Sequence, residues 1–214
     1  MIIIVPILIF YQLIYYYLPQ SYNWYLLHTI VNFFALITVY EDIWNIFTLK
    51  DSIDKLEPTG GLLGLKEPIV FLECLISGLH IFHIRYAPKY EDFVHHILMS
   101  ITLHICTMSL KPIFATSLIF FMNGLPGGID YFLLIQVKRN VISSIVEKNI
   151  NTYLNNYIRA PGILILIGFI MPVLEINIYS CFCLLTCFFN AVYYNREVCV
   201  NYGRKSKSMT RRQL

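Results

Sequence analysis

The residues best suited to chemistry are two adjacent histidines, His95 and His96, with Asp92 one helical turn before them. The surrounding segment is otherwise apolar enough to lie in a lipid bilayer. Ionisable side chains are costly to place inside a membrane segment, so by default they mark a functional site. Imidazole titrates near neutral pH, and it can therefore take a proton from an amine or a hydroxyl while a carboxylate, Asp92 or Asp130, holds its tautomer. This pattern predicts a general base or a proton relay.

A second group of ionisable residues lies on the preceding apolar segment. Glu73, His80 and His83 are spaced by seven and three residues, so they share one face of a helix. The connection to the segment of His95 and His96 is short, which makes the two helices antiparallel neighbours. We therefore expect four histidines to converge near one end of a helical bundle. In that arrangement, His80, His83 and Asp92 would contact a bound substrate.

A run rich in glycine and proline, residues 123–128, interrupts the apolar segment 113–137. Asn123 and Asp130 flank this run. Glycine and proline free backbone polar groups at membrane depth, and only a cavity lined by protein or water can satisfy those groups. The sequence thus predicts a discontinuous helix whose polar residues line a site, with Asn123 binding substrate and Asp130 working with the histidines.

Two other interpretations of the polar residues stay open. Imidazole is a common ligand of iron and zinc, so His80, His83, His95 and His96 could hold a metal in an oxidase or hydroxylase. Membrane hydroxylases, however, use more histidines than the six present here, and no metal is expected. Alternatively, the polar residues only hold helices together through hydrogen bonds, each worth about 1 kcal/mol.

Composition defines the class of protein. Of 214 residues, 57% are hydrophobic and only 14% are charged, and the mean hydropathy is +0.61, well above the range of soluble globular proteins. The sequence predicts an all-α integral membrane bundle, one domain over residues 1–203 with a basic tail at 204–214. The net charge of +3 is too small to indicate nucleic acid as a partner.

The six cysteines lie in apolar segments, and we interpret them as small hydrophobes without a disulfide framework or zinc spacing.

A membrane-spanning helix needs about 20 mostly apolar residues. Seven segments are candidates, a count that could be six or eight: residues 1–18, 24–40, 68–86, 92–110, 113–137, 161–176 and 177–194. The first segment lacks the features of a cleavable signal and is expected to stay as a helix. A turn is predicted at residues 58–61, where the sequence reads Pro-Thr-Gly-Gly.

The region 138–159 alternates apolar and polar residues at helical spacing, which predicts either an amphipathic helix at the membrane interface or a plain connecting helix. With seven spans, twelve of the sixteen Lys and Arg fall on one side of the membrane. Positive residues favour the cytosol, so the C-terminus is expected there. The basic tail would act as a topology anchor, with lipid head groups or a retention receptor as alternative partners.

The order of these residues resembles the TLC-domain family, which includes ceramide synthases and translocon-associated membrane proteins. His95-His96 is followed some thirty residues later by a polar break with Asp130, and eight residues further by Lys138. Arg159-Ala160-Pro161 resembles a later Arg and Pro of the family, and Tyr40-Glu41-Asp42 resembles the Tyr and Asp that close an early family helix. The resemblance covers roughly residues 24–194.

The resemblance implies a protein of the endoplasmic reticulum, or of a membrane derived from it, that binds or modifies a lipid between its helices. The implied reaction is transfer of an acyl group from acyl-CoA, as a co-substrate, to a lipid amine, with His95, His96 and Asp130 as catalytic residues and no cofactor. Asn123-Gly124 stands where ceramide synthases have His-Asp, which favours a non-enzymatic rival, a lipid-sensing or lipid-trafficking protein. The expected partner is a membrane lipid, and a homo-oligomer is left open.

Overall fold

The structure, a computed structural model, describes residues 4–18, 21–48, 57–63, 67–84 and 90–213. These residues are helical, with no strand among them. The elements are α1 (Ile4–Tyr17), α2 (Asn23–Phe47), the 3-10 turn η2 (Gly61–Leu63), α3 (Pro68–Ile84), α4 (Tyr90–Ser109), α5 (Pro112–Ile119), the π-helical turn η3 (Phe120–Gly124), α6 (Leu125–Lys138), α7 (Ser144–Leu154), the π-helical turn η4 (Asn155–Arg159), α8 (Ala160–Ile170), the 3-10 turn η5 (Met171–Val173) and α9 (Ile178–Gln213).

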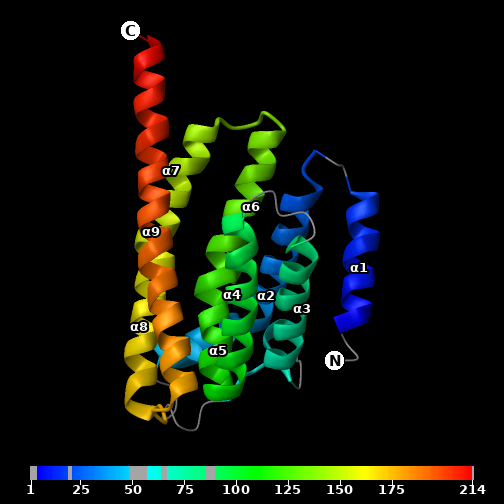
Figure 1. The fold of residues 1–214 in the computed structure, drawn as a ribbon, viewed down its shortest axis with the longest axis vertical. Coiled ribbons are helices and arrows are strands. Elements are labelled where there is room, and N and C mark those ends of the chain that lie inside the picture. Colours follow the sequence, from blue (N-terminus) through cyan, green and yellow to red (C-terminus); the bar gives the residue numbers. More distant parts are fainter. Residues whose placement is uncertain (1–3, 19–20, 49–56, 64–66, 85–89, 214) are drawn as a thin grey trace.

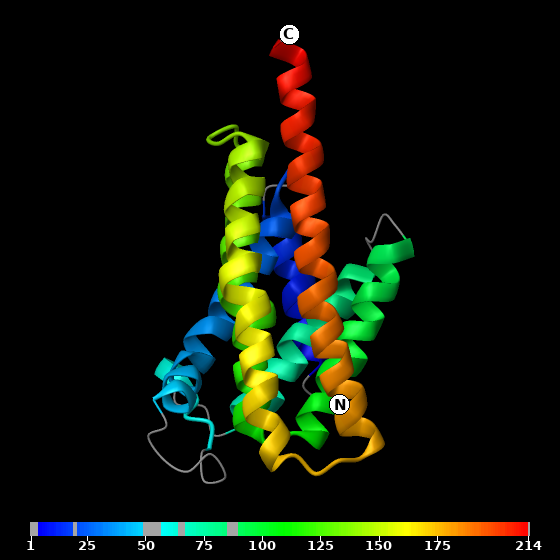
Figure 2. The same ribbon diagram turned by 90° about the vertical axis from the view of Figure 1, so that its left-hand side faces the viewer.

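The elements form seven helical rods within the described residues, because α5, η3 and α6 are one continuous helix and α7, η4, α8 and η5 are another. Consecutive rods run in opposite directions (Figure 1). The last rod, α9, is the longest, and its C-terminal end projects beyond the rest of the bundle (Figures 1 and 2). The predicted basic tail at 204–214 is thus helical up to Gln213.

Four helices of the described chain are long and apolar enough to cross a membrane: Asn23–Phe47, Pro112–Lys138, Ser144–Val173 and Ile178–Ser208. The shorter helices Pro68–Ile84 and His96–Ser109 are also apolar. The all-α architecture expected from the sequence is confirmed, and the four long helices are compatible with a membrane-integral protein. The count of seven spans stays a prediction.

Two predictions about helix boundaries are wrong. The run at 123–128 does not break its helix, because the π-helical turn η3 carries the chain into α6 with Pro126, Gly127 and Gly128 buried. The region 138–159 is not a separate amphipathic helix either. Its helix begins at Ser144, where the side chain of Ser143 caps the first turn, and continues through η4 to Val173. In both helices the proline lies in the first turn after the π-helical turn, where a missing backbone N–H is tolerated.

The predicted turn at 58–61 is confirmed, and a buried carboxylate holds it. Gly60 and Gly61 have φ of +74° and +55°, a region that glycine adopts without strain. Asp42 of α2 is fully buried and accepts hydrogen bonds from the backbone N–H of Thr59 (2.9 Å), from the Thr59 hydroxyl (3.1 Å) and from the Thr116 hydroxyl of α5 (2.5 Å). One carboxylate therefore joins α2, the turn and α5.

The apolar interior has two parts that meet at α5 and η3. One contains buried residues of α1, α2, α3 and α5, including Tyr11, whose hydroxyl donates to the backbone oxygen of Leu75 at 2.7 Å. The other contains buried residues of α4, α5, η3, α8 and α9. Phe120 packs against both parts. The two halves of the bundle are thus held by a shared central helix.

Candidate functional site

A cavity of about 1130 Å³ lies between α2, α3, α4, α6, η4 and α9. Four histidines, two carboxyl groups and a guanidinium contribute to its wall, together with tyrosine, tryptophan and asparagine side chains. The ionisable residues are His28, His80, His83, His96, Asp130, Arg159 and Glu197. The volume is large enough for the head group and part of an acyl chain of a lipid.

The predicted convergence of histidines from α3 and α4 is confirmed for three of the four residues. His80 and His96 are buried, and their ring centres are 5.1 Å apart. The ring of His96 meets that of His83 edge-on, and Nε2 of His96 contacts Nδ1 of His83. In this contact one nitrogen donates a hydrogen bond and the other accepts it. Two neighbouring imidazoles joined in this way can move a proton along the cavity wall.

His28 of α2 adds a fourth imidazole, which sequence reasoning missed. It is buried, stacks on Tyr131 of α6 at 4.1 Å and meets Trp24 edge-on at 4.4 Å. Trp24 also touches the ring of His83, with centres 3.5 Å apart. The sequence contained a sign of this role, because His28, like His96, is an ionisable residue inside an apolar segment. The imidazoles are thus embedded in an aromatic wall.

The carboxyl group of Asp130 lies in the same cavity wall, on α6. It accepts a hydrogen bond from the side-chain amide of Asn151 at 2.7 Å, and Asn155 donates in turn to Asn151 at 2.6 Å. Glu147 is 1% exposed, pairs with Lys148 at 3.1 Å and also interacts with Asp130. A polar network from α7 and η4 therefore supports Asp130.

Arg159 completes this wall from η4. Proline has no backbone N–H, so Pro126 cannot make the usual helical bond to the backbone oxygen of Met122. The guanidinium of Arg159 donates to that oxygen instead. It also donates to Asn155 at 3.5 Å, and it lies 6.0 Å from the ring centre of Tyr194. A cation on one helix thus satisfies the backbone of another, and this bond ties the two π-helical turns together.

The mouth of the cavity is defined by residues that both line it and are exposed. These are Tyr90 and Val94 near the start of α4, and Phe189 and Tyr193 on α9. Figure 2 shows α4 and α9 separating toward the N-terminal end of α4. The mouth is therefore apolar and opens sideways between two helices.

The structure brings five of the seven predicted site residues into one cavity. His80, His83, His96, Asn123 and Asp130 all line it. The side chains of His95 and Asp92 lie outside the described residues, so their predicted roles are not tested. Asp130 is bonded to Asn151, and His96 contacts the rings of His83 and His80. Glu73, predicted to share a face with His80 and His83, also faces α4, where it pairs with His104 and Thr107.

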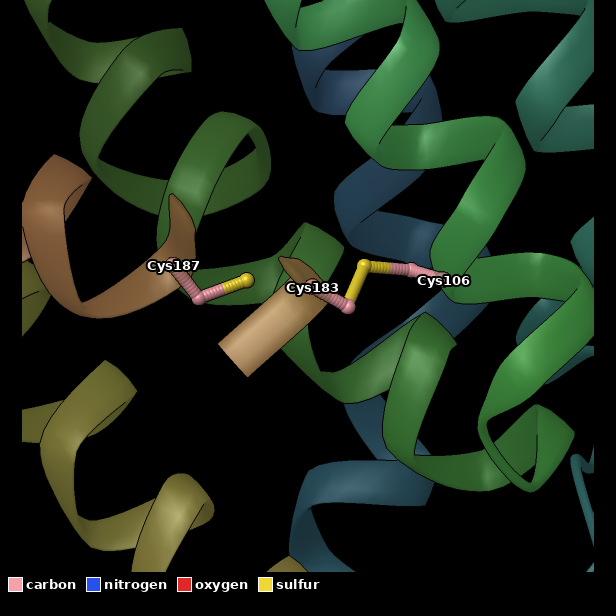
Figure 3. Close-up of side chains that lie close together, drawn as sticks. All are labelled: Cys106, Cys183 and Cys187. Carbon is pink, nitrogen blue, oxygen red and sulfur yellow. A yellow bond between two sulfur atoms is a disulfide. The ribbon is translucent and has the colours of Figure 1, made fainter. Parts of the chain in front are cut away.

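The interpretation of all cysteines as unpaired small hydrophobes is wrong for two of them. Cys106 of α4 and Cys183 of α9 form a disulfide, with Cα atoms 5.7 Å apart (Figure 3). Their positions differ by 77 in the sequence, so spacing gave no sign of the pair. Cys187 lies one turn further on α9 with a buried thiol, and all three sulfur atoms lie within 4.8 Å of one another. The disulfide joins α4 to α9 at the end opposite the cavity mouth.

These three cysteines are the group with metal-ligand spacing in the described part of the chain, and no histidine belongs to that group. Two of the three sulfur atoms are consumed by the disulfide. Four of the described histidines, His28, His80, His83 and His96, line the cavity instead, which suits proton transfer or ligand binding.

In comparisons with protein-family models, with curated proteins and with solved structures, the chain finds no match. The cavity therefore has to be interpreted from its own geometry.

Proposed function

We propose that this chain is an integral membrane protein that binds a lipid in the cavity between its helices. The observation that carries the proposal is the cavity itself: about 1130 Å³ inside a bundle of apolar helices, with four imidazoles, two carboxyl groups and one guanidinium in its wall. Polar groups at that depth are costly unless they serve a site. The apolar sideways mouth suits a ligand that arrives from the bilayer.

The orientation of α7 supports membrane insertion. Glu147, Asn151 and Asn155 point into the bundle and are buried, whereas Val146 and Tyr153 are 45% and 56% exposed. A helix of a soluble protein has the opposite arrangement, with its apolar face in the core. An apolar face turned outward is expected when the surroundings are lipid. By the excess of Lys and Arg in the connections, we place the C-terminus in the cytosol.

For chemistry, the arrangement and the resemblance to the TLC-domain family favour acyl transfer from acyl-CoA to a lipid amine. His96 takes the proton of the amine as its nitrogen attacks the thioester carbon. The new C–N bond forms, the C–S bond breaks, and the leaving thiolate takes up the proton. His83 contacts His96, so it is suited to hold the tautomer of that ring and to pass the proton on. His95 and Asp130 remain part of the proposed catalytic set.

Lipid binding is tested by mass spectrometry of lipids that copurify with the protein in nanodiscs. Thr186 lines the cavity, and the neighbouring Leu185 is 69% exposed and does not line it. Thr186→Trp should reduce the bound lipid several-fold by filling the cavity, whereas Leu185→Trp should leave it unchanged. Wild-type protein without bound lipid, or equal lipid in both variants, would contradict the proposal.

A further inference from the structure

The guanidinium of Arg159 is short of partners for a cation at this depth. Its Nε is buried and has no hydrogen-bond partner among the described residues. The ion pairs in the described part of the chain are Glu73 with His104, Glu147 with Lys148, and Glu197 with Arg196, and Arg159 belongs to none of them. Asp130 acts on it electrostatically, but the carboxyl group of Asp130 is bonded to Asn151. A charged group inside a membrane protein normally has a counter-charge.

A second polar group in the cavity is also incomplete. Asn190 of α9 is 4% exposed and lines the cavity. Its amide nitrogen meets only the sulfur of Met99, at 3.5 Å, and its Oδ1 has no hydrogen-bond partner among the described residues. Asn190 lies one helical turn before Tyr194, whose ring faces Arg159. An unused acceptor therefore lies near an unused donor with a positive charge.

These two groups define what the ligand must offer. Arg159 requires oxygen atoms that carry negative charge, because guanidinium binds carboxylate and phosphate through several N–H groups. Asn190 requires a hydrogen-bond donor such as a hydroxyl, because buried acceptors are costly to leave unpaired. We infer that the cavity binds a lipid whose head group carries an oxyanion at Arg159 and a hydroxyl at Asn190. This inference rests on the proposed lipid-binding function and names the substrate class within it.

The position of the mouth agrees with this orientation. Val94, Phe189 and Tyr193 form an apolar, exposed rim between α4 and α9, so the chain of the lipid lies there while its head group reaches inward. The imidazoles of His83 and His96 line the same cavity.

The inference is tested with three ligands of the same oleoyl chain, measured by competition against a fluorescent lipid. Lysophosphatidate carries an anion and a hydroxyl, oleate carries an anion only, and monooleoylglycerol carries hydroxyls only. The expected order of affinity is lysophosphatidate, then oleate, then monooleoylglycerol. Arg159→Gln should lower the affinity for the two anionic ligands by about 10- to 100-fold, since a charge-assisted hydrogen bond is lost. The affinity for monooleoylglycerol should not change. Arg204→Gln, an exposed charge loss on α9, should change none of the three affinities.

Arg159 also supports the backbone of Met122, so a second variant leaves it untouched. Asn190→Asp keeps the side-chain shape and places a negative charge in the cavity wall that holds the guanidinium. This variant should lower the affinity for both anionic ligands and leave the affinity for monooleoylglycerol unchanged. Equal affinity for all three ligands, or equal losses for anions and monooleoylglycerol in both variants, would overturn the inference while the lipid-binding function stands. Binding of none of the three would overturn both.

Discussion

Arg159 donates a hydrogen bond to the backbone oxygen of Met122, the acceptor that Pro126 leaves unused one helical turn later. Each residue lies in a π-helical turn, and each turn is followed by Pro-Gly, at Pro126-Gly127 and Pro161-Gly162. The bond thus connects two helices where both depart from regular geometry. It also places a cation at the cavity wall, so the same residue serves the packing of the helices and the site.

The crossing of these two helices requires a glycine at position 162. A Cβ atom there would lie 2.2 Å from Cδ1 of Phe121. Gly162→Ala should therefore lower the free energy of unfolding by about 1–3 kcal/mol through overpacking. The matched control is Gly168→Ala on the same helix, where nothing lies within 4 Å of the added atom. Thermal unfolding in detergent should show a lower Tm for the first variant only, and equal Tm values would contradict the prediction.

Asp42 should be needed for stability. Asp42→Ala removes the acceptor of three hydrogen bonds and leaves the buried hydroxyl of Thr116 with the backbone oxygen of Ile113 as its acceptor, which should cost about 2–4 kcal/mol. The adjacent Glu41 bonds only to Tyr40 at the surface, so Glu41→Ala should change stability by less than about 0.5 kcal/mol. Denaturant unfolding measures both, and a mild effect of Asp42→Ala would show that the turn is held by other contacts.

His96 should be needed for turnover but not for lipid binding. In an assay with acyl-CoA and a long-chain amine, His96→Ala should lose about 100-fold or more in rate, because a general base is removed. His104 provides the control, since its side chain is 61% exposed and pairs with Glu73 away from the cavity. His104→Ala should keep full activity. Lipid binding without turnover by the wild-type protein would instead identify the non-enzymatic carrier or sensor.

The disulfide predicts a defined thiol count. Denatured, unreduced protein should take up four maleimide groups, at Cys74, Cys181, Cys187 and Cys199, and reduced protein should take up six. Cys106→Ser should take up five with or without reduction. Removing this crosslink should also lower stability, by up to about 4 kcal/mol for a loop of this length. Intact-protein mass spectrometry gives the count, and six adducts without reduction would contradict the disulfide.

The all-α class, the turn at 58–61 and the convergence of His80, His83 and His96 could be predicted because each depends on local spacing. Hydropathy defines the helices, glycines permit the turn, and residues three or four apart share a helix face. The prediction of a break at 123–128 is wrong because a helix tolerates a proline when another group donates a hydrogen bond to the carbonyl that the proline leaves unpaired. That group, Arg159, is 37 positions away.

By itself, the sequence determined which segments are helical and apolar and which helices carry ionisable groups. The tertiary structure alone decided that His28, Arg159 and Asn190 join the predicted histidines in one cavity, and that Cys106 meets Cys183. The physical reason is that helix faces follow from a period of 3.6 residues, whereas contacts between helices depend on how whole side-chain surfaces pack. Packing of that kind brings together residues far apart in the chain, and no local pattern records it.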